Sequence, residues 1–321
     1  MNPSLKKALN IAIPMLLGLG LVAYSYFSTS AEEREQIVFY IKNVDPFWVA
    51  ISLLLGILSH LSRAIRWNYL LQPLGYQPKI SNNLFIVLIA YFANLGIPRS
   101  GEVLRATALT KYEKVPFEKG FGTIVTERVI DLIMLLLVII VTLILQTDVI
   151  LDIAKTKGLN MVAMLSVAVV GVVGLIIFLR IIKKSNSKLV QKLREFLTGL
   201  LQGILSIFKM EKKWSFIGHT LFIWLAYVGM FWVIKYTLPE TELLGLGPIL
   251  VAFIAGAFAI SATNGGIGLY PIAVSAALSI YGVDSISGDA FGWIMWISQT
   301  LMVVVFGAIS FMILPLLNKS S

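Results

Sequence analysis

The feature that most constrains the fold is an apolar run, Leu84–Leu95, that stops before it can cross a bilayer. A membrane's hydrocarbon core is about 30 Å thick, and an α-helix needs ~20 apolar residues to span it. Here the chain breaks at the Gly- and Pro-containing segment 96–102 and becomes apolar again over Val103–Leu109. Irregular backbone at membrane depth is tolerated only where protein buries it or where it lines a cavity. We therefore predict a re-entrant helical hairpin over residues 84–109.

Composition indicates the class of protein that contains this hairpin. The chain is 58% hydrophobic and 13% charged, whereas soluble domains carry about 25% charged residues. Its apolar runs are long, which favours helices over a barrel and predicts an all-α polytopic membrane protein. The chain has no cysteine and only two histidines, so thiolate metal sites are excluded and histidine-rich ones are disfavoured. No nucleotide-binding loop, zinc helix or nucleophile elbow occurs in a usable context. We expect no metal, no cofactor, no catalytic residue and no enzymatic activity.

The net charge of +9 has a better explanation than binding to nucleic acid. Lysines and arginines collect in loops on one predicted side, as the positive-inside rule expects of cytoplasmic loops, where anionic headgroups also attract them. We therefore expect no nucleic-acid partner. Lys6 and Lys7 precede an apolar run, Leu9–Phe27, that is longer than the core of a signal peptide. This favours a retained first helix, and both termini are predicted to be cytoplasmic in a protein of the cell membrane.

A second interrupted run follows later in the chain. The apolar stretch between Pro248 and Ile280 breaks at the Gly-rich segment 261–268, which predicts another hairpin over residues 248–280, entered from the outer side. Between the hairpins, residues 188–208 place apolar side chains at helical spacing, as an interfacial amphipathic helix does. The remaining long runs predict about six transmembrane helices: Leu9–Phe27, Pro46–Ile65, Phe121–Leu145, Leu159–Ile182, Trp214–Tyr236 and Phe291–Leu317. The connections expected on the outer side are polar and acidic: the stretch Glu32–Lys42, a loop with Asp148 and Asp152, residues 239–242, and the residues around Asp284 and Asp289.

The order of these elements repeats. Residues 1–150 and 151–321 each give two helices, a broken hairpin and a further helix. Three full crossings in the first half turn the second half upside down, which predicts an inverted repeat. If Leu84–Leu95 instead crossed fully, Arg99 and Arg105 would emerge outside, so the charge rule prefers the re-entrant form. Paired interrupted segments at matching positions indicate a transporter-like site near the interface between the repeats.

The inner hairpin carries the first candidate site. Arg99 lies in the break, while Glu102 and Arg105 are three residues apart and share a face of the following helix. Guanidinium groups and the unpaired N–H groups of a helix start both bind phosphate. The sequence thus predicts a phosphate receptor. Alternatively, Glu102 pairs with an arginine only to lower the cost of burying it.

Three further groups of residues complete the candidate substrate-binding set. Glu127 and Asp131 lie one helical turn apart, with Arg128 beside them, and either relay a proton or latch this helix to the hairpin by ion pairs. The outer break offers Asn264, Gly265 and Gly266, whose side chain and exposed backbone suit hydrogen bonds to a headgroup; alternatively these glycines only permit the turn. Arg66, with Arg63, borders the inner hairpin, although both are also typical of interface anchors. We take His60 as a packing residue and expect Lys235 to snorkel to the outer interface.

These residues resemble a known family, the flippase-like membrane proteins that share the transmembrane region of lysylphosphatidylglycerol synthases. The resemblance extends over nearly the whole chain and implies movement of a charged or glycosylated lipid between leaflets. At the outer break this chain has Asn264 where the family often has proline, and Tyr270-Pro271 where it has a charged pair. Four stretches carry the likeness: Arg66-Trp67 with Leu70-Leu71; Pro98-Arg99 with Gly101-Glu102 and Arg105; Glu127-Arg128 with Asp131; and residues 265–268.

Three hypotheses of function follow. The leading one is binding of the anionic headgroups of membrane lipids and their translocation, with Arg99 and Arg105 on the phosphate. The second is a membrane subunit, or partner, of an enzyme that modifies lipids by aminoacyl or glycosyl transfer. The third is a scaffold for such an enzyme that does not itself transport lipid. In the family, the synthases join this region to a soluble aminoacyl-transfer domain, which has no counterpart in this sequence.

Overall fold

The computed structural model describes residues 3–156, 174, 180, 190–191 and 210–318, and within these residues it contains helices and no strand. This confirms the predicted all-helical class. The predicted transmembrane helix Leu159–Ile182 and the amphipathic helix at 188–208 lie outside the described residues.

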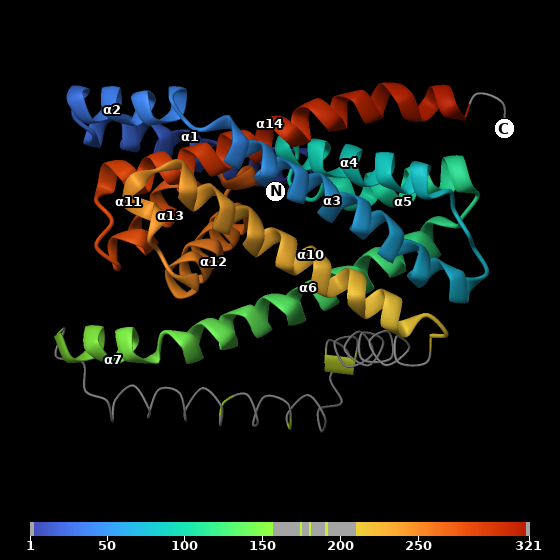
Figure 1. Ribbon diagram of the computed structural model, residues 1–321. Helices are drawn as coiled ribbons and strands as arrows, with labels where there is room; N and C mark the ends of the chain where they lie inside the picture. The colour runs from blue at the N-terminus through green and yellow to red at the C-terminus, as the bar shows by residue number, and fades with distance from the viewer. Residues whose placement is uncertain (1–2, 157–173, 175–179, 181–189, 192–209, 319–321) are drawn as a thin grey trace. The chain divides into compact units, whose positions relative to one another are not determined.

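The chain forms two compact units, which we describe separately. The main unit comprises Met1–Val125 and Trp214–Ser321, and the second unit comprises Thr126–Lys213. Packing defines these units, whereas the halves 1–150 and 151–321 were defined by the repeated pattern and stay a prediction. Figure 1 follows the chain through both units. Among the described residues, the second unit contains the later part of α6 (Phe117–Leu145) and α7 (Thr147–Thr156).

The main unit contains most of the described helices. They are α1 (Pro3–Ser28), α2 (Ala31–Lys42), α3 (Pro46–Leu71), η1 (Gln72–Leu74), α4 (Ile80–Gly96), α5 (Ser100–Glu113), the start of α6, α10 (Lys213–Ile234), η2 (Lys235–Thr237), α11 (Pro239–Glu242), α12 (Leu246–Ala262), η3 (Asn264–Gly266), α13 (Leu269–Ser279) and α14 (Ser285–Leu317).

Four helices of the described chain are long and apolar enough to cross a membrane, so the protein is a multi-pass membrane protein. They are Pro46–Leu74, Phe117–Leu145, Lys213–Thr237 and Ser285–Leu317. Shorter apolar helices accompany them, including α4, α12 and α13. In the described chain a long helix, a broken pair of short helices and a long helix therefore occur twice in this order.

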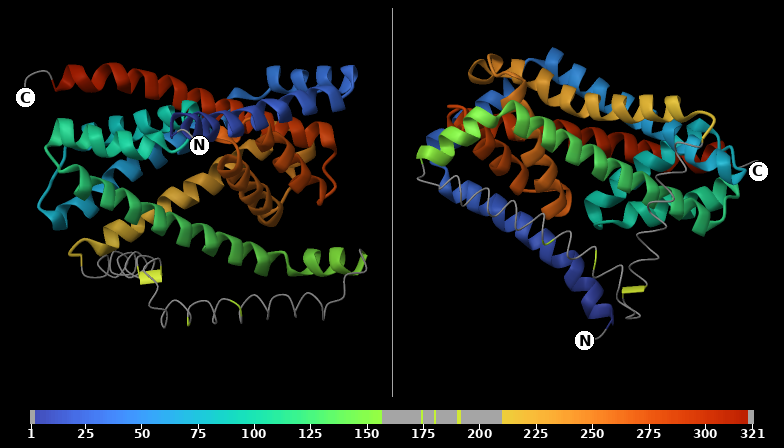
Figure 2. Two further views of the ribbon diagram at one scale, coloured as in Figure 1. Left: turned by 180° about the vertical axis from the view of Figure 1, so that it is seen from behind. Right: turned by 90° about the horizontal axis from the view of Figure 1, so that it is seen from below.

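The inner hairpin is two helices folded back on each other, α4 and α5, which run side by side in Figures 1 and 2. Asn94 of α4 accepts a hydrogen bond from the backbone N–H of Gly101 (2.7 Å), and the Ser100 hydroxyl donates to the Ala93 carbonyl (3.2 Å). A Cβ at Gly101 would collide with the Ala90 carbonyl oxygen. A glycine is therefore required at position 101, where α5 lies close to the backbone of α4.

The outer hairpin, formed by α12 and α13 around η3, turns with glycines in left-handed conformations. Gly268 has φ +72°, and a Cβ there would also collide with the Gly18 carbonyl of α1. The first helix thus packs directly on the outer break. The side-chain amide of Asn264 donates to the Leu95 carbonyl in the last turn of α4 (2.7 Å), so the tips of the two hairpins meet.

Two helices occupy stretches for which the sequence analysis predicts only polar connections. α2 begins with a capping box, in which Ser30 accepts from the N–H of Glu33 (3.1 Å) and the Glu33 carboxylate accepts from the N–H of Ser30 (2.8 Å). These two bonds satisfy donors that a helix start otherwise leaves unpaired. The second such helix, α7, contains Asp148 and Asp152, which were expected in a loop.

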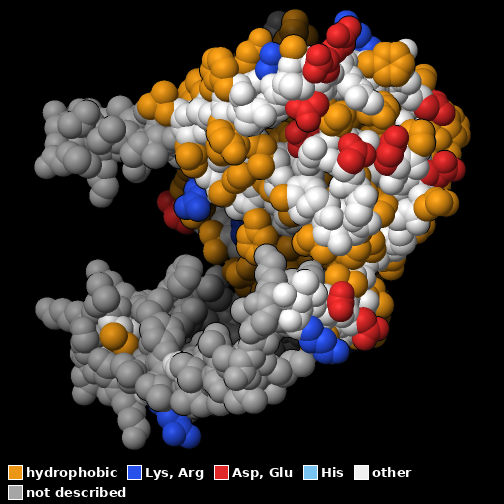
Figure 3. All heavy atoms as spheres, turned by 90° about the vertical axis from the view of Figure 1, so that its left-hand side faces the viewer, with side chains coloured by type: hydrophobic (Ala, Val, Ile, Leu, Met, Phe, Trp, Pro, Cys, Tyr) orange, Lys and Arg blue, Asp and Glu red, His pale blue; other side chains and the backbone are white. Residues whose placement is uncertain are grey.

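Acidic side chains gather at the end of the main unit that holds α2, α11 and the start of α14, as Figure 3 shows. They include Glu32, Glu240, Glu242 and Asp284. This end corresponds to the loops predicted to be outside from their acidic character. The orientation itself stays a prediction.

Candidate functional site

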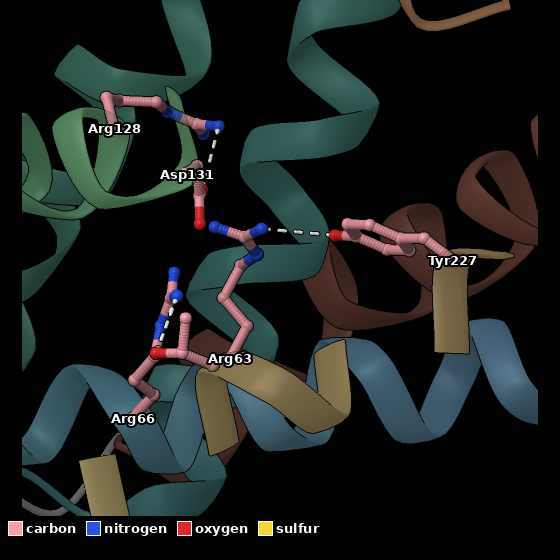
Figure 4. Close-up of polar contacts among 6 residues, drawn as sticks. Arg63, Arg66, Arg128, Asp131 and Tyr227 are labelled. Carbon is pink, nitrogen blue, oxygen red and sulfur yellow. Dashed lines mark hydrogen bonds and ion pairs between the residues drawn. The ribbon is translucent and has the colours of Figure 1, made fainter. Parts of the chain in front are cut away.

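Three arginines of the main unit are buried, two on α3 and one on α5. Arg63 is 2% exposed, Arg66 0% and Arg105 2%. Arg63 and Arg66 are one helical turn apart and share a face of α3, and Figure 4 shows both extending from that helix. We call these three residues the arginine cluster. The expectation that Arg63 and Arg66 serve as interface anchors does not fit, because an anchor keeps its charged head in contact with water.

Helix α10 supplies hydroxyl groups to the two arginines of α3. The Arg63 guanidinium donates to the Tyr227 hydroxyl (3.1 Å), which is drawn in Figure 4. The Arg66 guanidinium donates to the hydroxyl of Thr220 (3.3 Å). Both partners lie more than 150 positions along the chain from the arginines they contact. The site is thus assembled from two membrane-spanning helices.

Trp67 connects the third arginine to this pair. The Arg105 guanidinium carbon lies 4.1 Å from the centroid of the Trp67 ring, so the cation stacks on the indole face. The Trp67 ring N–H donates to the hydroxyl of Thr123 at the start of α6 (2.9 Å). A desolvated cation–π contact contributes about 2 kcal/mol. Trp67, which is itself fully buried, therefore holds Arg105 against α3, the helix that carries Arg63 and Arg66.

The arrangement has a chemical consequence. Charged side chains within membrane-spanning helices are costly and commonly mark the path of a substrate or ion. Guanidinium groups are always protonated, and each presents several donors in a planar fork that matches phosphate or carboxylate oxygens. Three buried guanidinium groups on α3 and α5 therefore have the chemistry that recognition of an anion requires.

The predicted residues of the inner hairpin lie in different settings. Arg99 is exposed in the break, with φ 62°, as the residue before α5, whereas Arg105 is buried six residues further on. At 1.5 Å per residue this is about 9 Å along the axis. Glu102 lies between them and is half-buried. The N–H of Gly101, at the start of α5, is occupied by Asn94. The sequence analysis missed Asn94; its signal is an amide within an apolar run, seven residues before the glycine.

The acidic residues of α6 belong to the second unit. Glu127 is fully buried. Arg128 and Asp131 approach within 3.9 Å as an ion pair one helical turn apart (Figure 4). Glu127 and Asp131 are four residues apart on the same helix and so share a face, as the sequence predicts.

At the outer break, Asn264 is 3% exposed and its amide N–H contacts the inner hairpin, as described above. The Gly265 carbonyl accepts from the ring N–H of Trp296 on α14 (2.8 Å), while Gly266 is buried. These predicted residues therefore form the contact between the two hairpins. Within the described chain, the side-chain oxygen of Asn264 is buried and has no hydrogen-bond partner.

Two other expectations can be compared with the structure. His60 is buried, with its ring 4.6 Å from that of Tyr91, in agreement with a packing residue. Lys235 does not snorkel. Its ammonium is buried, donates to the Leu244 carbonyl (2.8 Å) and lies 4.0 Å from the centroid of the Trp232 ring.

The fold and the site define a class: a multi-pass helical membrane protein with two broken hairpins that meet at their tips and with arginines buried between its helices. Comparison with known proteins gives the family. The chain belongs to the family described as the lysylphosphatidylglycerol synthase TM region, whose model matches residues 11–308. The resemblance noted from the motifs is thereby confirmed.

Curated relatives match the chain over shorter stretches. A UPF0104 membrane protein of Methanocaldococcus jannaschii is 30% identical over 129 residues, 39% of this chain and 36% of that protein. The glycosyltransferase AglD of Haloferax volcanii is 26% identical over 133 residues, 41% of this chain and 21% of that protein. A UPF0104 membrane protein of Methanothermobacter thermautotrophicus is 26% identical over 107 residues, 33% of this chain and 30% of that protein. The matches thus span about a third or less of these relatives. No solved structure matches the chain.

Proposed function

We propose that the protein binds the anionic headgroup of a membrane lipid and moves that lipid between the leaflets of the cell membrane. The observation that carries this proposal is the burial of Arg63, Arg66 and Arg105 on helices of a membrane protein. Three cations at membrane depth are far more than helix packing needs. Their forked donors match the oxygens of a phosphate.

The meeting of the hairpin tips supports a transport role. In transporters built from inverted repeats, discontinuous helices from the two repeats form the substrate site near the middle of the bilayer. Here the Asn264 side chain bonds the last turn of α4, so the inner and outer breaks share one contact. We infer that both hairpins are re-entrant, that the halves form an inverted repeat, and that the tip contact separates the two sides of the membrane.

The acidic residues have a proposed role in turnover. Glu102 lies on the same helix face as Arg105, and Glu127 and Asp131 share a face of α6. We assign them to balancing the arginine charge once the headgroup leaves, or to exchanging protons during transport. Their spacing of three and four residues supports this assignment.

The experiment is lipid translocation in liposomes that contain the purified protein and headgroup-labelled anionic lipids. We expect Arg66→Ala and Arg105→Ala to abolish both headgroup binding and translocation. Lys111→Ala, which removes an exposed charge from the same hairpin, should leave both unchanged. Wild-type translocation by Arg66→Ala, with the protein folded, would overturn the proposal. We also test Arg99→Ala, and expect a smaller effect because Arg99 is exposed.

A second candidate function is favoured by one observation. A relative of the chain is named a glycosyltransferase, so the protein can instead serve as the membrane subunit or partner of a lipid-modifying enzyme. In that case purified protein would show no translocation of any lipid, and a glycosyl- or aminoacyl-transferring enzyme would co-purify with it from its native membrane.

A further inference from the structure

A groove runs between α3 and α10, on helices that also carry the arginine cluster. Its volume is about 490 Å³, within the range of about 300–1,000 Å³ typical of ligand pockets. Its walls are mainly apolar, from Leu58 and Ile65 on α3 to Phe222 on α10. Both helices are long and apolar enough to span the membrane, so the groove lies along two candidate membrane spans.

One polar pair interrupts these apolar walls. The Ser62 hydroxyl and the Nδ1 atom of His219 are 2.8 Å apart, and the Tyr69 ring lies 5.9 Å from the His219 ring, centroid to centroid. Within the described chain the Nε2 atom of His219 makes no hydrogen bond. In either tautomer or when protonated, His219 therefore retains a donor or an acceptor for a further group.

The depth of this pair matches that of a lipid's polar linkage. His219 lies six residues after Lys213, the first residue of α10, which is about 9 Å along the axis. The interfacial layer on each side of a bilayer is about 5–8 Å thick, from the difference between the whole membrane and its core. Trp214, 76% exposed at the helix start, is typical of the aromatic belt at that layer. The Ser62–His219 pair is then placed where headgroups give way to hydrocarbon.

The groove is next to residues of the arginine cluster in the sequence of both helices. Thr220, which accepts from Arg66, directly follows His219, and Arg66 directly follows Ile65. A lipid chain in the groove would thus lie beside the same two helices whose Arg66 and Thr220 side chains are hydrogen-bonded to each other.

The walls of the groove indicate what fills it. Beyond the Ser62–His219 pair, counted away from the start of α10, the lining residues are Leu58 and Leu61 on α3 and Phe222 on α10. The described residues that line the groove include no charged side chain. Apolar walls on one side of a polar pair match a hydrocarbon chain that continues from its polar linkage.

We propose that the α3–α10 groove holds one hydrocarbon chain of the lipid that is transported, with Ser62 and His219 contacting the polar linkage between chain and headgroup. This deepens the proposed function and rests on it, since the headgroup of the same lipid is assigned to the arginine cluster. The protein would accordingly select its substrate by both chain and headgroup.

The test fills the groove without touching the arginines. A Cβ at Gly218 meets no atom within 4 Å, so Gly218→Leu places its side chain in the open groove. Gly20→Leu is the matched control, because Gly20 of α1 is equally open and lies outside the groove. The probe is phosphatidylglycerol with a diazirine in one acyl chain, in phosphatidylcholine vesicles that contain the purified protein. Labelled peptides are identified by mass spectrometry, and binding of glycerol phosphate is measured separately.

We expect labels on residues 58–65 and 215–222, reduced at least tenfold in Gly218→Leu and unchanged in Gly20→Leu, while glycerol phosphate binds both variants like wild type. Labelling of the groove that is equal in Gly218→Leu and wild type would overturn the inference, as would absence of label from residues 58–65 and 215–222 in wild type. These results leave the headgroup assignment standing. If instead Arg66→Ala leaves glycerol phosphate binding intact, the proposed function fails, whatever the labelling pattern.

Discussion

The close contact between α4 and α5 allows a prediction in which the same substitution has opposite effects at two glycines. In Gly101→Ala the new methyl group collides with the Ala90 carbonyl oxygen and comes within 2.8 Å of the Asn94 amide nitrogen. In Gly96→Ala the methyl group meets no atom within 4 Å, and the residue is the last of α4. The two substitutions add the same atoms to the same hairpin.

The magnitudes follow from the contacts. Alanine in place of glycine favours a helix by about 0.5–1 kcal/mol, which is the expected gain or near-neutral effect at Gly96. At Gly101 the hairpin helices must separate, which costs about 1–3 kcal/mol for overpacking. If the Asn94 bond also breaks, the unsatisfied N–H costs about 1–3 kcal/mol more. With both costs present and the gain in helix propensity subtracted, we expect Gly101→Ala to be net destabilising by about 1–5 kcal/mol.

The assay is thermal unfolding of the purified protein in detergent, together with binding of an anionic lipid. Because α5 carries Arg105 against Trp67, Gly101→Ala should also weaken lipid binding, whereas Gly96→Ala should not. Equal melting temperatures and equal binding for the two variants would refute the reasoning that close backbone approach fixes the inner hairpin.

Three other predictions follow from contacts described above. Arg105→Lys keeps the charge but loses the planar stack on Trp67, so anionic lipid should bind at least several-fold more weakly in equilibrium binding; wild-type affinity would show that charge alone suffices. Asn264→Leu removes the donor to the α4 carbonyl, and we expect slower translocation in liposomes with unchanged headgroup binding; loss of both would place Asn264 in the binding site instead. Hydrogen bonds from the backbone and side chain of Ser30 lower the pKa of Glu33 below its usual value. Because the folded pKa is the lower one, this stabilisation of α2 is complete above the unfolded pKa of about 4.3 and is lost as the pH falls through the folded value. Hydrogen exchange of the first turn of α2 should rise over that range in wild type, relative to a Glu33→Gln variant, which lacks the titrating carboxyl.

The hairpins were predictable from sequence because the residue types at each break are enough to show where the helix ends. Gly and Pro after a run too short to span a bilayer leave few alternatives, and both breaks occur at segments where the pattern predicts them. The start of α2 carried an equally local signal, since Ser30 and Glu33 have capping-box spacing. We predicted a polar connection there because the charged residues of this stretch were given more weight than its capping-box spacing.

The composition of the arginine cluster was less predictable because it depends on contacts between distant segments. Arg63 and Arg66 near the end of an apolar helix have the same local pattern as interface anchors, and only Tyr227 and Thr220 on α10 distinguish the two cases. Those two residues are single polar positions in an apolar span, with no motif around them. Arg99 and Arg105 were grouped by closeness in sequence, whereas a helix separates residues six apart by nearly two turns and turns them to different surroundings.

In the contact between the hairpin tips, the outer hairpin contributes a side chain and the inner hairpin contributes only backbone. The two breaks should therefore differ in which substitutions they accept. The inner hairpin contributes only the carbonyls of Leu95 and, at 3.5 Å, Gly96, and any residue at those positions carries the same oxygen. The outer hairpin contributes the side-chain amide of Asn264, which few residue types can replace. Random substitution should therefore be accepted at position 95 whenever the side chain fits, and rejected at position 264 almost regardless of size. The residue at position 95 can thus change without loss of the contact, whereas a chain with proline in place of Asn264 has to join its two hairpins by a different contact.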